Sequence, residues 1–229
     1  TFIVDTDFLL YTIVDHTPLS SIYRQIIKEL QALRCTIIIP FEVVLEVIKH
    51  AEFAERNYNY FRNAFDAVDE FVVEEKIGNI YVKGYYNAVL SGVIDGKQVS
   101  FKDYLSNFFD ANSPIKFLQE VIKNSIEGQF KILEISEISN ESLDPTKLQE
   151  LTDAIYDETN KTFKANYRSE EENKEVAETD AKLYLTLNNL NSKSERNSGE
   201  VFSGTHYLLT SSTRAIRCAW KQGYKHNVI

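Results

Sequence analysis

The sequence predicts an α/β fold with a central parallel sheet. Short apolar runs alternate with helical segments near both ends of the chain, and several of the runs end at polar residues. This alternation is typical of parallel strand-helix units, whose crossovers are right-handed and place helices on both faces of the sheet. The 229 residues, 43% of them hydrophobic, are enough to bury a substantial core. We therefore expect one large domain that can carry an insertion.

The expected elements follow from local patterns. Continuous apolar runs indicate buried strands, and apolar residues repeating at intervals of three or four indicate helices. Proline ends the second strand, and Ser20 or Ser21 would cap the first expected helix. In chain order we expect a strand at 2–4, a helix at 20–33, a strand at 36–40, a helix from 41 through 50 toward 65, a helix at 175–191, a strand at 206–210, a helix at 212–222 and a strand at 226–229.

The middle of the chain differs from its ends. Residues from about 57 to 173 have mostly helical periodicity and many charges, whereas the expected sheet elements lie in 1–56 and 174–229. We therefore predict a single domain with a large helical insertion, which could provide a surface for a protein partner or for homo-oligomerisation. The polar, acidic stretch 167–175 suits a solvated linker.

Composition restricts the functional classes. The net charge of -9 argues against a protein whose whole surface grips nucleic acid, although carboxylates gathered around a metal would add to that negative count. The apolar runs are far shorter than the roughly 20 residues of a membrane helix, and no signal-peptide pattern is present. Cys35 and Cys218 make no disulfide framework. We expect a soluble, cytoplasmic protein; its first residue is Thr1, so residues upstream could be missing.

Three acidic residues are candidates for chemistry. Asp5 follows an apolar strand, at the sheet edge where α/β proteins bind ligands, although a lone aspartate there more often caps a helix or turn. Glu46 lies among apolar neighbours in a predicted buried helix, and Asp180 lies on the apolar stripe of its own helix. A buried carboxylate needs a partner, which can be a metal, backbone donors or a basic residue. For Asp180, Arg214 or Lys182 could be that residue.

The three acids come from separate strand-helix units that would converge at one edge of the sheet. Oxygen ligands of this kind suit a hard divalent cation, Mg²⁺ or Mn²⁺. Such a cation activates water and stabilises charge on a phosphoryl oxygen during hydrolysis. The sequence therefore predicts a metal site with nuclease chemistry.

Four segments resemble the successive motifs of PIN-domain ribonucleases, in the same order and in the same strand or helix context. They are residues 2–10, 40–46, 178–181 and 207–212. The resemblance covers 1–56 and 174–229, and it implies a PIN-like three-layer α/β/α fold that cleaves RNA. The acids of the first three motifs map onto Asp5, Glu46 and Asp180, which the resemblance identifies as catalytic, metal-binding residues.

Some positions depart from the family pattern or are secondary candidates. The family often has a fourth acid where this chain has Ser212, and it commonly has asparagine where this chain has Asp7. Thr210 and Ser212 are candidates for the rim of the site. Glu42, one turn before Glu46, could share the site or could simply be solvated in the first helical turn, where acids are favoured.

The leading expectation is a Mg²⁺- or Mn²⁺-dependent endonuclease that acts on RNA, with single-stranded DNA as another substrate. One alternative is a PIN-like module that has lost catalysis and serves as a scaffold or regulator, which Ser212 in the fourth position would allow. Another alternative is an unrelated α/β domain in which arginine or lysine side chains neutralise all three acids.

Overall fold

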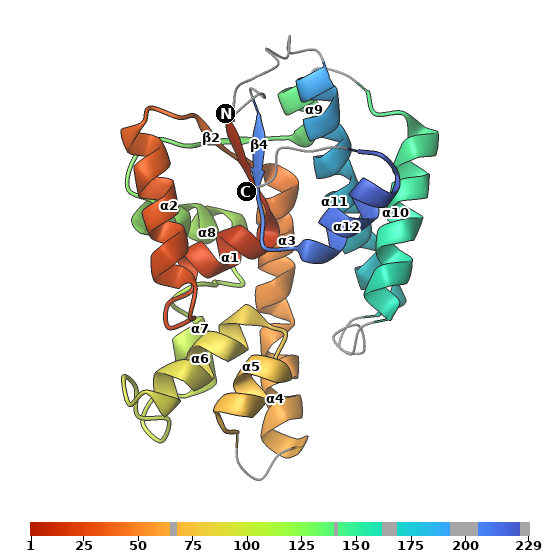
Figure 1. Cartoon of the computed structure of the whole chain (residues 1–229). Helices are drawn as coiled ribbons and strands as arrows, with labels where there is room; N and C mark the ends of the chain where they lie inside the picture. The colour runs from red at the N-terminus through yellow and green to blue at the C-terminus, as the bar shows by residue number, and fades with distance from the viewer. Residues whose placement is uncertain (65–67, 140–141, 162–168, 193–205, 225–229) are drawn as a thin grey trace. The chain divides into compact units, whose positions relative to one another are not determined.

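The computed structural model describes residues 1–64, 68–139, 142–161, 169–192 and 206–224 (Figure 1). Four parallel strands form one sheet in the order β3-β2-β1-β4. Their bounds are Phe2–Val4 for β1, Ile37–Pro40 for β2, Lys131–Leu133 for β3 and Tyr207–Leu209 for β4. The predicted α/β class with a parallel sheet is confirmed.

The two central strands and β4 are apolar along their whole length because both of their faces are covered. Every residue of β1, β2 and β4 is buried. Phe2 lies opposite Ile37 on one side and opposite Tyr207 on the other, and the rings of Phe2 and Tyr207 stack with centroids 5.1 Å apart. β1 is therefore an interior strand, and its carboxyl end brings Asp5 next to the end of β4.

The chain divides into two compact units that are interleaved in sequence. The first unit contains Thr1–Phe8, Arg34–Val43 and Gln129–Ile229, and the second contains Leu9–Leu33 and Val44–Gly128. The chain passes between the units four times, and two of these crossings fall within helices, α1 (Thr6–Ile13) and α3 (Phe41–Glu52). The whole sheet belongs to the first unit.

The helices of the first unit pack around the long helix α11. This helix contacts α9, α10 and α12, and its buried residues include Ala177, Leu183 and Leu187. The bounds are Ile135–Ser139 for α9, Pro145–Asn160 for α10, Glu170–Ser192 for α11 and Thr213–Lys221 for α12. The apolar stripe of α11 thus carries Asp180 into the interior.

The second unit is helical and has an aromatic core. The ring of Tyr58 stacks on that of Phe101 with centroids 4.5 Å apart, and Tyr85 and Tyr104 contact Phe101 as well. The helices that lie wholly in this unit are α2 (Ser20–Ala32), α4 (Ala54–Ala64), α5 (Glu70–Glu75), α6 (Ile80–Leu90), α7 (Phe101–Leu105) and α8 (Pro114–Ser125). The tyrosine-rich segments are core packing in this unit.

Several local predictions need correction. The N-cap of α2 is Leu19, not a serine, and the Ser20 hydroxyl donates to the backbone carbonyl of Thr17 instead. The helix expected to run from 41 toward 65 is two helices, α3 and α4. Residues 170–175, predicted as linker, form the first turns of α11 because their glutamates suit a helix N-terminus. The strand predicted at 226–229 lies outside the described residues.

The predicted insertion at 57–173 coincides with neither unit. β3 lies within it and pairs with β2, and α10 also belongs to the first unit. β3 is only three residues long and is partly exposed, so its apolar pattern was too short to indicate a strand. Within the described part of the chain, no helix combines the length and apolar character that crossing a lipid bilayer requires.

Candidate active site

Asp5 is the first residue after β1, and its carboxylate is held from two sides. The Asp5 side chain is buried, with its Oδ1 accepting a hydrogen bond of 2.7 Å from the backbone N–H of Thr6. Its Oδ2 accepts from the hydroxyl of Thr210, which in turn accepts from the backbone N–H of Ser212 at 2.9 Å. The ends of β1 and β4 are therefore joined through this carboxylate, which has donors on both oxygens.

Asp180 reaches the same region from α11. It is only 5% exposed, and its Oδ2 lies 3.6 Å from Nη2 of Arg214 on α12. Lys182 instead forms an ion pair of 2.7 Å with Glu178. Of the two basic partners that the sequence allowed for Asp180, the structure selects Arg214.

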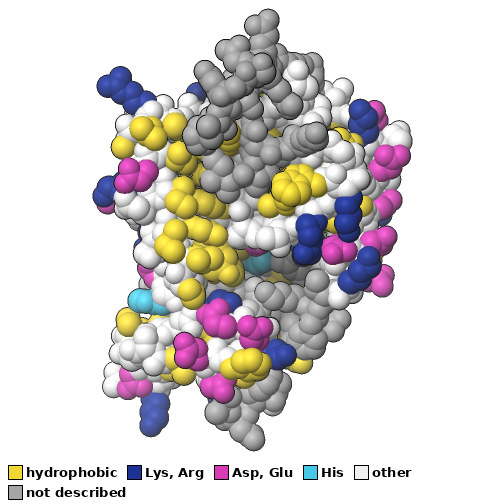
Figure 2. All heavy atoms as spheres, in the orientation of Figure 1, with side chains coloured by type: hydrophobic (Ala, Val, Ile, Leu, Met, Phe, Trp, Pro, Cys, Tyr) yellow, Lys and Arg dark blue, Asp and Glu magenta, His cyan; other side chains and the backbone are white. Residues whose placement is uncertain are grey.

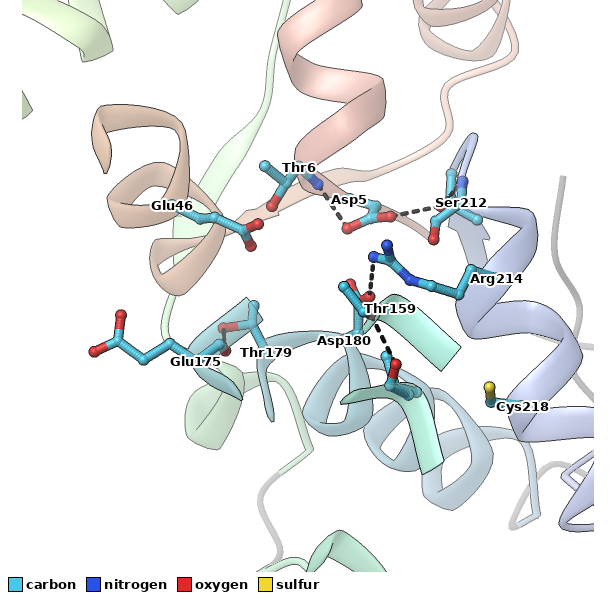
Figure 3. A network of polar contacts seen from close by, with 12 residues as sticks. Asp5, Thr6, Glu46, Thr159, Glu175, Thr179, Asp180, Ser212, Arg214 and Cys218 are labelled. Atoms are coloured by element: carbon cyan, nitrogen blue, oxygen red, sulfur yellow. Dashed lines mark hydrogen bonds and ion pairs between the residues drawn. The ribbon is translucent and has the colours of Figure 1, made fainter. Parts of the chain in front are cut away.

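The two carboxylates and the Arg214 guanidinium point toward one another (Figure 3). Tyr184, one turn after Asp180 on α11, lies near both acids. Burial raises the pKa of its hydroxyl most, and the charges of Asp5 and Asp180 raise this pKa further. Among the described residues, the Arg214 Nε–H is buried and has no hydrogen-bond acceptor. The site thus combines two buried carboxylates with a guanidinium that retains a donor for an anionic oxygen.

Glu46 belongs to the second unit, whereas Asp5 and Asp180 belong to the first. It lies on α3 and is 8% exposed, and its Oε1 lies 3.8 Å from Nε2 of His50, one helical turn later. The structure therefore brings Asp5 and Asp180 together within one unit and places Glu46 beside a histidine in the other.

The secondary candidates have local roles. Both carboxylate oxygens of Glu42 accept from the backbone N–H of Ile135, at 3.2 and 3.1 Å, so Glu42 holds the start of α9. Asp7 lies in the first turn of α1, where the helix dipole favours an acid. Ser212 is the N-cap of α12, but its side chain makes no capping hydrogen bond. Thr210, predicted at the rim of the site, contacts Asp5 directly.

Asp5 and Asp180 offer few ligands for the predicted cation. No group of three or more histidine, cysteine, aspartate or glutamate side chains within the described ranges is arranged to hold a metal ion. Mg²⁺, however, is often held by one or two carboxylates together with water and substrate phosphate. The buried oxygens of Asp5 and Asp180 fit that mode of binding.

Sequence reasoning did not predict that Tyr184 lies near both acids. The available signal was its position four residues after Asp180, on the same buried stripe of α11. No pattern in the sequence indicated Thr6, because it donates to Asp5 through its backbone N–H.

No protein-family model, curated protein or solved structure matches this chain.

Proposed function

We propose that this chain is a divalent-metal-dependent endonuclease that hydrolyses phosphodiester bonds in RNA, with single-stranded DNA as a second substrate. The observation that carries the proposal is the convergence of two buried carboxylates, Asp5 and Asp180, on Arg214 within one unit (Figure 3). Burying two carboxylates is unfavourable unless cations compensate them, which is a common cost of functional sites. The resemblance to PIN-domain ribonucleases supports RNA as the substrate and a PIN-like three-layer arrangement of the sheet unit.

Each side chain has a defined part in this proposal. Asp5 and Asp180 would hold Mg²⁺ or Mn²⁺, and the bound cation would polarise a phosphoryl oxygen and acidify a water. Thr6 and Thr210 fix the two oxygens of Asp5. Arg214 can turn its unoccupied Nε–H toward a phosphate oxygen, which guanidinium groups bind well. In the reaction, the water oxygen bonds to phosphorus, the ester P–O bond breaks, and the proton passes to the leaving oxygen.

Cleavage of end-labelled RNA and single-stranded DNA, with Mg²⁺, Mn²⁺ or EDTA, tests the proposal. We expect metal-dependent cleavage by the wild type and a loss of at least about 100-fold in Asp180→Asn, since even groups that only support a metal ligand cost roughly that much when removed. Asp157→Asn is the matched control, because it makes the same chemical change on an exposed aspartate of the same unit. This control should cleave as the wild type does.

Two results would contradict the proposal. Equal cleavage by wild type and Asp180→Asn would place the activity elsewhere, and no cleavage by folded wild type in either metal would remove it. Glu46→Gln, assayed in the same way, tests separately whether the third predicted carboxylate is needed.

A catalytically inactive scaffold is the second candidate, and two observations favour it. Arg214 already neutralises Asp180, and a serine stands where the family often has its fourth acid. If this candidate is correct, calorimetry will detect no binding of Mn²⁺ to the wild type, and Asp180→Asn will change only its stability.

A further inference from the structure

The helix that carries Arg214 is the most basic element of an acidic chain. α12 contains Arg214, Arg217 and Lys221 and no acidic residue, and of the helices that the structure describes it has the largest excess of basic over acidic residues. The chain as a whole has a net charge of -9. Among the described helices, α12 is therefore the one whose own charge most favours a polyanion.

The outer face of α12 combines these charges with a large aromatic side chain. Trp220 is 61% exposed, and Arg217 and Lys221 lie on either side of it in sequence and are exposed as well. Residues three and four positions apart share a helix face, so Arg217 is next to both Trp220 and Lys221. We call these three residues the α12 strip. Over α12, Figure 2 shows Lys and Arg side chains beside hydrophobic ones.

The inner face of the same helix is fully used in packing. Ala215, Cys218 and Ala219 are buried, and the thiol of Cys218 contacts the backbone carbonyl of Ala154 on α10. The amphipathic pattern therefore explains the buried face of α12 but does not require a tryptophan on the outer one.

Two ordinary explanations of the strip have to be weighed. A single exposed hydrophobic residue is common on protein surfaces, and Arg217 already lies 3.4 Å from the carboxylate of Glu158. That ion pair is exposed, with 57% of the Arg217 side chain accessible, so it is weak and exchanges readily. These explanations do not account for the position of the only tryptophan in the sequence. It lies between two cations, on the helix whose first turn contacts Asp180 through Arg214.

We infer that the α12 strip binds single-stranded nucleic acid, with Trp220 stacking on a base and Arg217 and Lys221 contacting adjacent phosphates. Single strands are bound in this way, by an aromatic side chain together with nearby cations, because unpaired bases expose their faces. The inference extends the proposed nuclease function, since Arg214 at the start of the same helix contacts Asp180. Lys221 is seven positions after Arg214, or about 10 Å along the helix, so a bound strand could reach Asp5 and Asp180.

The intrinsic fluorescence of Trp220 provides a direct assay, because no other tryptophan contributes. We would titrate the full chain in EDTA with a 12-nucleotide oligouridylate, with the same length of duplex RNA, and with inorganic polyphosphate. We expect saturable quenching by the single strand and weaker responses to the other two. Duplex bases cannot stack on Trp220, and polyphosphate has no bases.

Variants separate the strip from general electrostatics. Arg217→Gln with Lys221→Gln should weaken oligonucleotide binding by about tenfold or more, as removing phosphate contacts does. Lys147→Gln with Lys174→Gln is the matched control, because it removes the same charge from exposed positions of the same unit. Trp220→Ala should weaken binding by a similar factor, because it removes the ring on which one base stacks. The anisotropy of a labelled oligonucleotide measures binding by this variant.

Each outcome decides for or against the strip, independently of catalysis. Binding in EDTA without cleavage in metal would support the strip and contradict the nuclease function. Metal-dependent cleavage with unchanged binding in both strip variants would contradict the strip and leave the nuclease function standing. The strip is also wrong if the control pair weakens binding equally, or if no oligonucleotide quenches Trp220, in which case a protein partner becomes the better occupant.

Discussion

Asp5 and Asp180 are two buried carboxylates that the same unit stabilises in different ways. Asp5 has fixed donors, a backbone N–H and a hydroxyl, on its two oxygens. Asp180 faces a guanidinium at 3.6 Å, which is longer than the roughly 2.8 Å of a charge-assisted hydrogen bond. Asp5 is therefore held by a hydrogen bond on each oxygen, whereas Asp180 and Arg214 form an ion pair that is longer than a hydrogen bond.

Tyr81 and Tyr104 offer a matched pair of hydroxyl deletions in the second unit. Burial raises the pKa of both, so both are protonated at neutral pH. The Tyr104 hydroxyl donates to the backbone carbonyl of Asp15 at 3.2 Å, whereas the buried Tyr81 hydroxyl has no partner among the described residues. Within the described part of the chain, only the Tyr104 hydroxyl thus contributes a hydrogen bond to the folded state.

We expect Tyr104→Phe to lower the free energy of unfolding by about 1 kcal/mol, because it leaves a carbonyl without its donor. Tyr81→Phe should leave that free energy unchanged or raise it, because it removes a polar group buried without compensation. Urea unfolding followed by circular dichroism measures both variants. A clear loss of stability in Tyr81→Phe would show that its hydroxyl has a partner in solution.

At the scale of elements, Asn79 connects α6 to α3. Its Oδ1 accepts from the backbone N–H groups of Tyr81 and Val82, at 3.1 and 3.3 Å, and so caps α6. Its Nδ2 donates to the backbone carbonyl of His50 near the end of α3, at 2.9 Å. One buried side chain therefore both starts one helix and attaches it to another.

Asn79→Ala should lower the free energy of unfolding by about 2 kcal/mol, roughly half from the lost cap and half from the lost buried hydrogen bond. Asp69→Ala is the comparison, because Asp69 is an exposed residue that caps α5 through one local bond to Val72. Its loss should be about 1 kcal/mol or less. Equal losses in the two variants would show that the contact with His50 contributes nothing.

At the scale of the whole molecule, the sheet is assembled from distant parts of the chain. β3 and β4 lie within Gln129–Ile229, but in the sheet they are separated by β2 and β1 from the amino-terminal part. The pairings of β2 with β3 and of β1 with β4 each need one strand from each part. The two strands of the carboxyl-terminal part have no neighbour of their own to pair with.

We expect the fragment 129–229 to leave the backbone amides of Tyr207–Leu209 unprotected from hydrogen exchange, although they are protected in the full chain. Adding the fragment 1–128 should restore the protection by supplying β1. Amide exchange read by NMR measures this directly. Protection of these amides in the isolated 129–229 fragment would mean that β4 finds a partner other than β1.

Some elements of the fold were predictable from the sequence and others were not, for physical reasons. Strands β1 and β2 and helix α11 were predictable because a continuous apolar run or a long periodic stripe is a local signal. β3 was not, because three partly exposed residues carry no pattern. Arg214 was one of two possible partners for Asp180, and only the approach of α12 to α11 selected it.

The sequence by itself determined the α/β class, the parallel order of strand-helix units near the ends of the chain, and the burial of Glu46 and Asp180. These features were predictable because the spacing of apolar residues indicates which face of a helix or strand is buried. Tertiary structure decided that Thr210 meets Asp5 and that Arg214 meets Asp180, whereas His50 faces Glu46 from one turn later in the same helix. It also placed the Glu42 carboxylate at the start of α9 and divided the chain into two interleaved units. Most of these partners are far apart along the chain, and their distances are set by packing rather than by any local pattern.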